Sequence, residues 1–130
     1  MLKVVVLTIS QGLLKKFLRD IPTPLLTYEL YTQFLNVTSL NSKEEQILTL
    51  KKLISELPKL NMNMLRMLLT LLHKIQLHST KNKMNSQNLA IVFGVGILRD
   101  KNATVQSVIQ DNSKITRVCE MLIDFVHQLF

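Results

Sequence analysis

Cysteine, proline and glycine are scarce in this 130-residue chain, which has one Cys, three Pro, three Gly and no Trp. The single cysteine, Cys119, cannot close an internal disulfide or build a cysteine-based metal site, and its presence alone suits a reducing, cytoplasmic location. So few glycines and prolines leave few points at which a helix must stop. Hydrophobic residues make up 47% and charged residues 19% of the chain. We therefore expect one globular, mainly helical domain.

Long apolar runs are also missing. An uninterrupted apolar run such as residues 4–7 is far too short to span a bilayer. The first residues faintly imitate a signal peptide, but the apolar stretch is short and Lys15 and Lys16 follow soon after it, so we expect no signal. The β-branched residues within 2–9 would suit a strand, yet the rest of the chain offers no strand to pair with it.

Residue groups typical of catalysis or metal binding are absent from the sequence. It contains no glycine-rich phosphate loop, no His-x-x-x-His pair and no Gly-x-Ser-x-Gly motif. His73 and His78 are five residues apart on one expected helix, so they point in different directions and are better interpreted as surface or boundary residues. Cys119 has no evident base near it in sequence and is expected in the core. We therefore expect no active site of the chain's own, no metal and no cofactor.

Positive charge prevails, with a net charge of +7 spread along the chain and no basic block. Such a surface attracts an acidic partner, a nucleic acid or an anionic membrane. Aromatic residues make up only 5% and none is interleaved with a basic run, which disfavours nucleic acid. An ordinary solvated lysine-rich surface stays open as an interpretation, and we expect membrane contact to be indirect.

Apolar residues recur at helical spacing in successive segments, which predicts an all-α fold. The first helix covers about 13–21 and ends at Pro22, and a short one follows at about 28–35 with Thr27 as its candidate cap. Ser42 and Glu45 have the spacing of a capping box for a helix that ends before Pro58. The remaining helices are expected with Asn61 as a cap and apolar positions 65–75, at about 85–98, and over 115–129.

Two glycines, Gly94 and Gly96, fall inside the expected helix at 85–98. Each weakens a helix by roughly 1 kcal/mol relative to alanine. They either let another backbone come close or mark an early end of the helix, and both interpretations stay open.

Two segments carry polar or charged patterns that packing in a hydrophobic core alone does not require. In the segment 13–26, Lys15 and Arg19 are four residues apart, so they project from the same helix face beside the apolar stripe. In the segment 82–94, the polar Asn88 precedes an apolar helix. Spacing alone favours the ordinary interpretation, in which Lys15 and Arg19 are solvated cations and Asn88 is a capping or turn residue.

At these segments the sequence resembles the Rho GTPase-activating protein (RhoGAP) domain family. That family carries LLKxFLRELPxPLL, matched here by residues 13–26. It also carries LP…N…LxxLLxxLxxVxxHSxxNKMTxxNLAIVFGPxLLR, matched here from Leu57 to Arg99. The resemblance runs from about residue 12 to the C-terminus, so residues 1–11 are expected to lie outside a RhoGAP-like helical bundle at 12–130 that is incomplete at its N-terminus.

The resemblance implies docking on the switch regions of a Rho-class small GTPase in its GTP-bound form. Lys15 and Arg19 fall where the family places a basic pair that contacts the GTPase. Asn88 falls where the family has an asparagine that binds near the switch. The implied mechanism is to order the GTPase's own catalytic glutamine and to stabilise charge at the γ-phosphate, so that the chain regulates a partner enzyme.

Two departures from the family pattern bear on this expectation. The family has an earlier loop with GxxRxSG, whose arginine enters the GTPase active site. None of the four arginines here lies in a glycine-bearing loop before the first matched helix. Since an arginine supplied in trans is worth roughly 10³–10⁵ in rate, we assign no catalytic residue. The second departure is Gly94-Val95-Gly96, where the family usually has Gly-Pro followed by Asn or Thr.

Three hypotheses remain at this point. The first is a RhoGAP signalling module that promotes GTP hydrolysis, and the second is a GTPase-binding adaptor that accelerates it little. The third is a helical scaffold without a GTPase partner. Because the earlier helices of the family are missing, we also expect exposed apolar surface around Leu14, Phe17 or Leu18, which residues 2–9 or a second copy in a homodimer would cover.

Overall fold

The computed structural model describes residues 13, 16–18, 20–78, 80 and 84–130, without the side chain of Val95. These residues form helices and no strand, so the all-α prediction is confirmed. The elements are α2 (Tyr31–Asn36), the 3₁₀ turn η1 (Val37–Ser39), α3 (Lys43–Ser55), α4 (Lys59–Leu77), α6 (Ser86–Ile97), α7 (Val105–Asp124) and α8 (Val126–Leu129). Among the helices that are described, none is both long and apolar enough to cross a bilayer.

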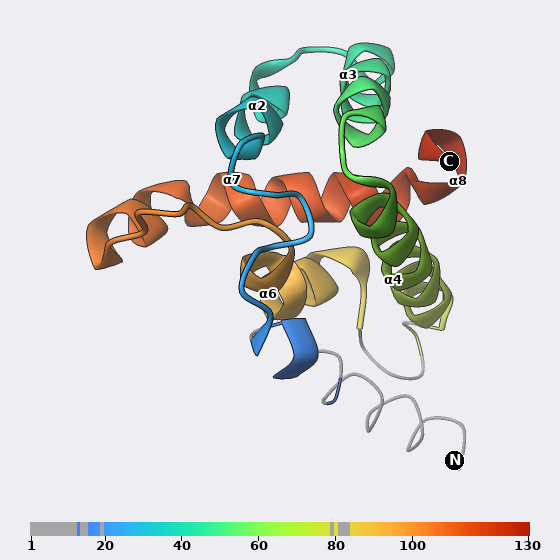
Figure 1. Ribbon diagram of the computed structural model, residues 1–130. Coiled ribbons are helices and arrows are strands. Elements are labelled where there is room, and N and C mark those ends of the chain that lie inside the picture. The colour runs from blue at the N-terminus through green and yellow to red at the C-terminus, as the bar shows by residue number, and fades with distance from the viewer. Residues whose placement is uncertain (1–12, 14–15, 19, 79, 81–83) are drawn as a thin grey trace.

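The long helix α7 lies across the middle of the molecule (Figure 1). It packs on α2, η1, α4 and α6, and α3 packs on α2, η1 and α8. The core that these helices share is aliphatic with two central aromatic rings. Its largest fully buried side chains include Phe34, Leu69, Phe93 and Leu122. Because helices from both halves of the sequence contribute to one core, the described residues fold as a single unit.

Local signals explain where α3 and α7 start. Ser42 caps α3, since its side chain accepts a hydrogen bond from the Glu45 amide at 3.1 Å, as its spacing predicts. The start of α7 is a reciprocal capping box: the Thr104 hydroxyl accepts from the Ser107 amide at 3.1 Å, and the Ser107 hydroxyl accepts from the Thr104 amide at 2.8 Å. That helix therefore starts well before Ile115, the first apolar position that we expected in it.

The predictions that Thr27 and Asn61 cap helices are both wrong. Thr27 has a left-handed backbone with φ of 65°, and the short helix begins only at Tyr31 after an N-cap residue, Leu30, that makes no side-chain hydrogen bond. Asn61 lies inside α4, which begins directly after Pro58, and its Nδ2 donates to the carbonyl oxygen of Leu25 at 3.1 Å. Thr27 therefore lies in a turn, and Asn61 makes a tertiary contact. Helical spacing reveals neither role.

The last helix is divided. The helix that we expected to run unbroken over 115–129 ends at Asp124, and α8 follows after Phe125. The Phe125 amide donates to Met121 O at 2.8 Å, so the chain keeps its helical direction before it turns. Val126 and Leu129 are still buried, because α8 packs on α3 and α4.

Candidate functional site

The segment that carries two of the three predicted site residues is described only in part. Lys15 and Arg19 lie outside the described residues. Leu18, between them, is buried at 3% exposure, so the expectation that it is exposed is wrong. Phe17 is 48% exposed, as expected for an uncovered apolar residue. Leu14 lies outside the described part of the chain.

Gly96 explains why Leu18 is buried. A Cβ atom at Gly96 would lie 2.6 Å from the Leu18 Cβ, so only a residue without a side chain permits this approach. Since α6 continues to Ile97, the glycine is a contact point and not the end of the helix. Of the two interpretations of the glycines, close approach of another segment is confirmed for Gly96.

Two hydrogen bonds reinforce this junction. The Leu26 amide donates to Ile97 O at 3.1 Å, and Arg99 Nη2 donates to Ile21 O at 2.8 Å. The described residues at the end of the first predicted helix are thereby fixed to the C-terminal end of α6. Asn88 lies eight residues before Gly96 in the same helix, about 12 Å away at 1.5 Å per residue.

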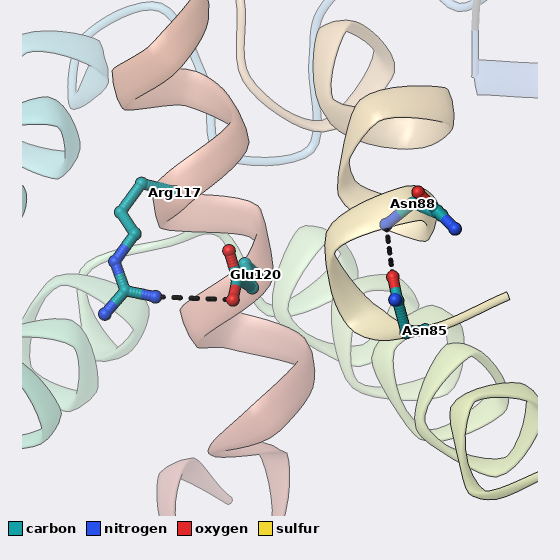
Figure 2. A network of polar contacts seen from close by, with 4 residues as sticks. All are labelled: Asn85, Asn88, Arg117 and Glu120. Carbon is teal, nitrogen blue, oxygen red and sulfur yellow. Dashed lines mark hydrogen bonds and ion pairs between the residues drawn. The ribbon is translucent and has the colours of Figure 1, made fainter. Parts of the chain in front are cut away.

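Asn88 is an exposed residue in the first turn of α6. The N-cap of this helix is Asn85, whose Oδ1 accepts a hydrogen bond from the Asn88 amide at 2.8 Å (Figure 2). Asn88 is therefore not the cap itself, and its side chain points away from α7 in that view. The opposite face of α6 carries Leu89, Ala90 and Phe93, all buried, and this packing fixes the helix.

An exposed apolar residue lies next to Asn88. Ile91, at i+3 on the same helix, is 61% exposed, and it shares that surface with Gln87. Between α6 and α7 these residues border a groove of about 330 Å³. Its lining consists of Gln87, Ile91, Asn112, Ser113, Thr116, Arg117 and Glu120. None of these residues was predicted from the sequence as part of a site, although the position of Ile91 outside the 89/93/97 apolar row is a signal that could have found it.

The charged residues of the groove form one ion pair. Arg117 Nη1 lies 3.5 Å from Glu120 Oε1, one turn along α7, and the side chains are 49% and 26% exposed. In Figure 2 the guanidinium extends from α7 on the side away from α6. An exposed pair of this kind contributes little stability because water screens it.

Three residues were predicted from the sequence to be core or surface residues and not site residues: Cys119, His73 and His78. Cys119 is fully buried, its Sγ lies 4.0 Å from Gly94 O, and burial raises the pKa of its thiol to about 12. It is a core residue, as predicted. His73 Nδ1 lies 3.0 Å from Ile123 O, and His78 is exposed, so both are boundary or surface residues, as predicted. The described residues contain no group of three or more His, Cys, Asp or Glu that could hold a metal ion.

Comparison with known proteins identifies a family and relatives that this chain resembles. The sequence model of the RhoGAP domain matches residues 5–102. A Rho GTPase-activating protein of Dictyostelium discoideum, gacN, is 45% identical over 119 residues, which are 92% of this chain and 20% of that protein. Human N-chimaerin is 34% identical over 117 residues, which are 90% of this chain and 26% of that protein. The chain thus spans only 20% and 26% of the length of these two relatives.

Solved structures agree with the sequence matches. Human Rho GTPase activating protein 15 superimposes with a TM-score of 0.83 at 31% identity, over 92% of this chain and 56% of that one. The BH domain of Graf, a GTPase regulator associated with focal adhesion kinase, gives 0.81 at 32% identity, over 90% and 62%. The family match starts before residue 12, and our boundary there stays a prediction. On fold and sequence together, the chain belongs to the RhoGAP domain family.

Proposed function

We propose that this chain docks on a Rho-class small GTPase in its GTP-bound form and promotes hydrolysis of the bound GTP. The observation that carries the proposal is the exposed Asn88 on α6, a helix that is held rigidly by its buried face. RhoGAP membership supports it, because relatives that match nearly the whole chain are Rho GTPase-activating proteins. The chain is in this account a regulator of a partner enzyme.

We propose Lys15 and Arg19 as the second part of the docking surface. Their neighbour Leu18 is fixed against Gly96, and Arg99 holds the carbonyl of Ile21. The net charge of +7 would speed the encounter with an acidic GTPase surface. Residues 12–130 would form the docking unit, and it would act in the cytoplasm.

A second candidate function is a GTPase-binding adaptor that accelerates hydrolysis little. The observation that favours it is the absence of a GxxRxSG motif from the sequence. Two of the other arginines are engaged, Arg99 with the Ile21 carbonyl and Arg117 with Glu120. Contacts that stabilise the ground state and the transition state equally raise affinity without raising the rate.

Two measurements separate these functions. The first is the affinity of the chain for Rho and Rac proteins loaded with a non-hydrolysable GTP analogue. We expect Asn88→Ala to weaken binding about tenfold, since a buried interfacial hydrogen bond is worth about 1–2 kcal/mol. Asn63→Ala, at an exposed position on α4, is the matched control and should bind like the wild type.

The second measurement is single-turnover GTP hydrolysis. Acceleration of about 10³-fold or more by this chain alone would contradict the adaptor function, because that factor is the contribution of a supplied arginine. Binding without such acceleration would favour the adaptor. If the wild type binds no GTPase in the analogue-bound state, both functions fail and the helical scaffold remains.

We also propose that a second copy can cover the apolar surface beside the first predicted helix. Phe17, Leu18 and Leu25 line a cavity of about 200 Å³ together with residues of α4, among them Met64 and Met67. Met67 is 74% exposed and methionine adapts its shape to a partner, which suits a homodimer contact.

A further inference from the structure

Two histidines from separate helices meet near the C-terminal end of the chain. His73 lies on α4, and His127 lies on α8, the short helix that follows α7 and packs on α3 and α4 (Figure 1). Their ring centroids are 4.7 Å apart, and the ring planes are nearly perpendicular, at 87°. Neither residue belongs to the docking surface proposed above, so the function of this contact is a separate question.

The hydrogen bond of His73 determines which of its ring nitrogens carries the lone pair. Nδ1 lies 3.0 Å from the carbonyl oxygen of Ile123. Because a carbonyl oxygen only accepts hydrogen bonds, the neutral ring has its proton on Nδ1 and its lone pair on Nε2. A backbone carbonyl that binds one ring nitrogen in this way is a common support for a histidine that ligates a metal ion. His73 is therefore held in the tautomer that can bind a metal ion through Nε2.

The separation of the two rings matches that of two imidazoles bound to one ion. A Zn–N bond of about 2.0–2.1 Å places each ring centroid roughly 3.2 Å from the ion. Two imidazoles at neighbouring coordination positions then have centroids roughly 4.5–5.2 Å apart, and the observed 4.7 Å lies within this range. His127 is exposed, so its ring can turn a nitrogen toward the ion without disturbing the core.

The local backbone favours a cation here, although the chain as a whole is positive. Ile123 belongs to the last turn of α7, and its carbonyl oxygen is the one that contacts His73. The C-terminal end of a helix carries partial negative charge, which stabilises a cation near it. The electrostatics of the helix end and the tautomer of His73 therefore favour the same ligand.

We propose that His73 and His127 form a binding site for Zn²⁺ that links α4 to α8. The described residues supply no group of three His, Cys, Asp or Glu, so water completes the coordination and the ion is exchangeable. The expectation of no metal considered His73 with His78, which lie five residues apart in the sequence, whereas the fold brings His73 to His127. The bound ion holds the C-terminal helix against α4, and this role is independent of GTPase binding.

Calorimetric titration of the full chain with zinc chloride at neutral pH tests the site. We expect the tightest site to take one Zn²⁺ per chain, and His127→Ala to weaken it about 10- to 100-fold, the loss typical even for a group that only supports a ligand. His78→Ala is the matched control, since His78 is an exposed histidine at the end of the same α4, and it should bind Zn²⁺ like the wild type. Magnesium chloride should give no binding, because Mg²⁺ prefers oxygen ligands.

Hydrogen exchange shows whether the ion joins the two helices. The amides of Gln128 and Leu129 both donate to Phe125 O, so their exchange reports the opening of α8. Added Zn²⁺ should slow this exchange in the wild type and leave it unchanged in His127→Ala.

Three results would contradict the proposal. The first is a wild type that binds no Zn²⁺, and the second is an equal loss in His127→Ala and His78→Ala, because exposed histidines in general would then hold the ion. The third is zinc binding that leaves the exchange of α8 unchanged, because the ion would then not link the helices. His73→Gln, which keeps a donor for the Ile123 carbonyl, is measured in parallel and should lose binding as His127→Ala does. Binding like the wild type in His73→Gln would also show the proposal to be wrong.

Discussion

Of the two described glycines, Gly96 has less room for a side chain than Gly94. In Gly96→Ala the new Cβ would lie 2.6 Å from Leu18 Cβ, too close for two carbon atoms. We expect a net loss of about 1–2 kcal/mol in the free energy of unfolding, because overpacking costs about 1–3 kcal/mol and alanine recovers up to about 1 kcal/mol of helix propensity. Urea denaturation measures it.

Gly94→Ala is the matched control for that substitution. Its new Cβ would lie 3.3 Å from the Cγ2 atom of Ile115, the end of a side chain that can move by a few tenths of an ångström. We expect a smaller loss or none. Equal losses at both glycines would contradict the special role of Gly96.

Single residues also show what the sequence could and could not reveal. The core role of Cys119 and the Ser42 cap follow from composition and local spacing, and the structure confirms both. Thr27 and Asn61 were mistaken for caps because a polar residue before an apolar run has the same local pattern whether it caps a helix or bonds elsewhere. The Asn61 contact to Leu25 joins residues 36 positions apart, and no local pattern encodes such a contact.

At the scale of elements, the bond between Tyr31 and Asp111 fixes α2 to α7. The Tyr31 hydroxyl donates to Asp111 Oδ2 at 2.7 Å. Burial, and then the hydrogen bond and charge of Asp111, raise the pKa of Tyr31 well above its usual value. The neutral phenol is thus favoured in the folded protein. We expect Tyr31→Phe to reduce the free energy of unfolding by about 1–2 kcal/mol at pH 7.

The same bond predicts a pH dependence with a definite sign. A group whose pKa is raised by folding contributes stability that is complete below its unfolded pKa, about 10 for tyrosine, and that is lost as pH rises beyond it. Between pH 9 and 11, the wild type should therefore lose stability more steeply than Tyr31→Phe. Parallel urea curves at pH 7, 9, 10 and 11 measure this, with Tyr28→Phe as the control, since the Tyr28 hydroxyl bonds an exposed carbonyl, Pro22 O. Equal slopes for Tyr31→Phe and the wild type would contradict the prediction.

Helix positions were more predictable than helix ends. Apolar spacing placed α3, α4 and α6 within a few residues, because their buried stripes repeat over several turns. It missed the part of α7 before Ile115, nearly three turns, whose apolar residues Val105 and Ile109 are exposed and belong to no buried stripe. The helix break at Phe125 was also missed. Val126 and Leu129 in α8 are buried against α3 and α4, so their spacing looks like a continuation of the buried stripe of α7.

At the scale of the whole molecule, apolar surface beside α4 remains outside the core. Met67 is 74% exposed and Phe17 is 48% exposed, and both line the cavity next to Leu18. We expect the chain to self-associate as its concentration rises and Met67→Lys to weaken that association, because the charge would have to be desolvated in the contact. Sedimentation velocity over a concentration series measures it.

Leu48→Lys provides the comparison for that variant. Leu48 is 68% exposed on α3, away from the cavity, so the added charge is equal while the location differs. If the two variants reduce self-association equally, net charge is the cause and the apolar surface beside α4 is not the contact.

The amide of Asn61 has a chemical consequence for the lifetime of the protein. Its Nδ2 is the donor that holds the Leu25 carbonyl against α4. Asparagine is among the residues that decay with heat and age, and hydrolysis of this amide would leave a carboxylate, which only accepts hydrogen bonds. The aged side chain would then face a carbonyl oxygen with like partial charge. Hydrolysis of this amide in old or heated preparations would thus weaken the contact that precedes α2, without any substitution in the gene.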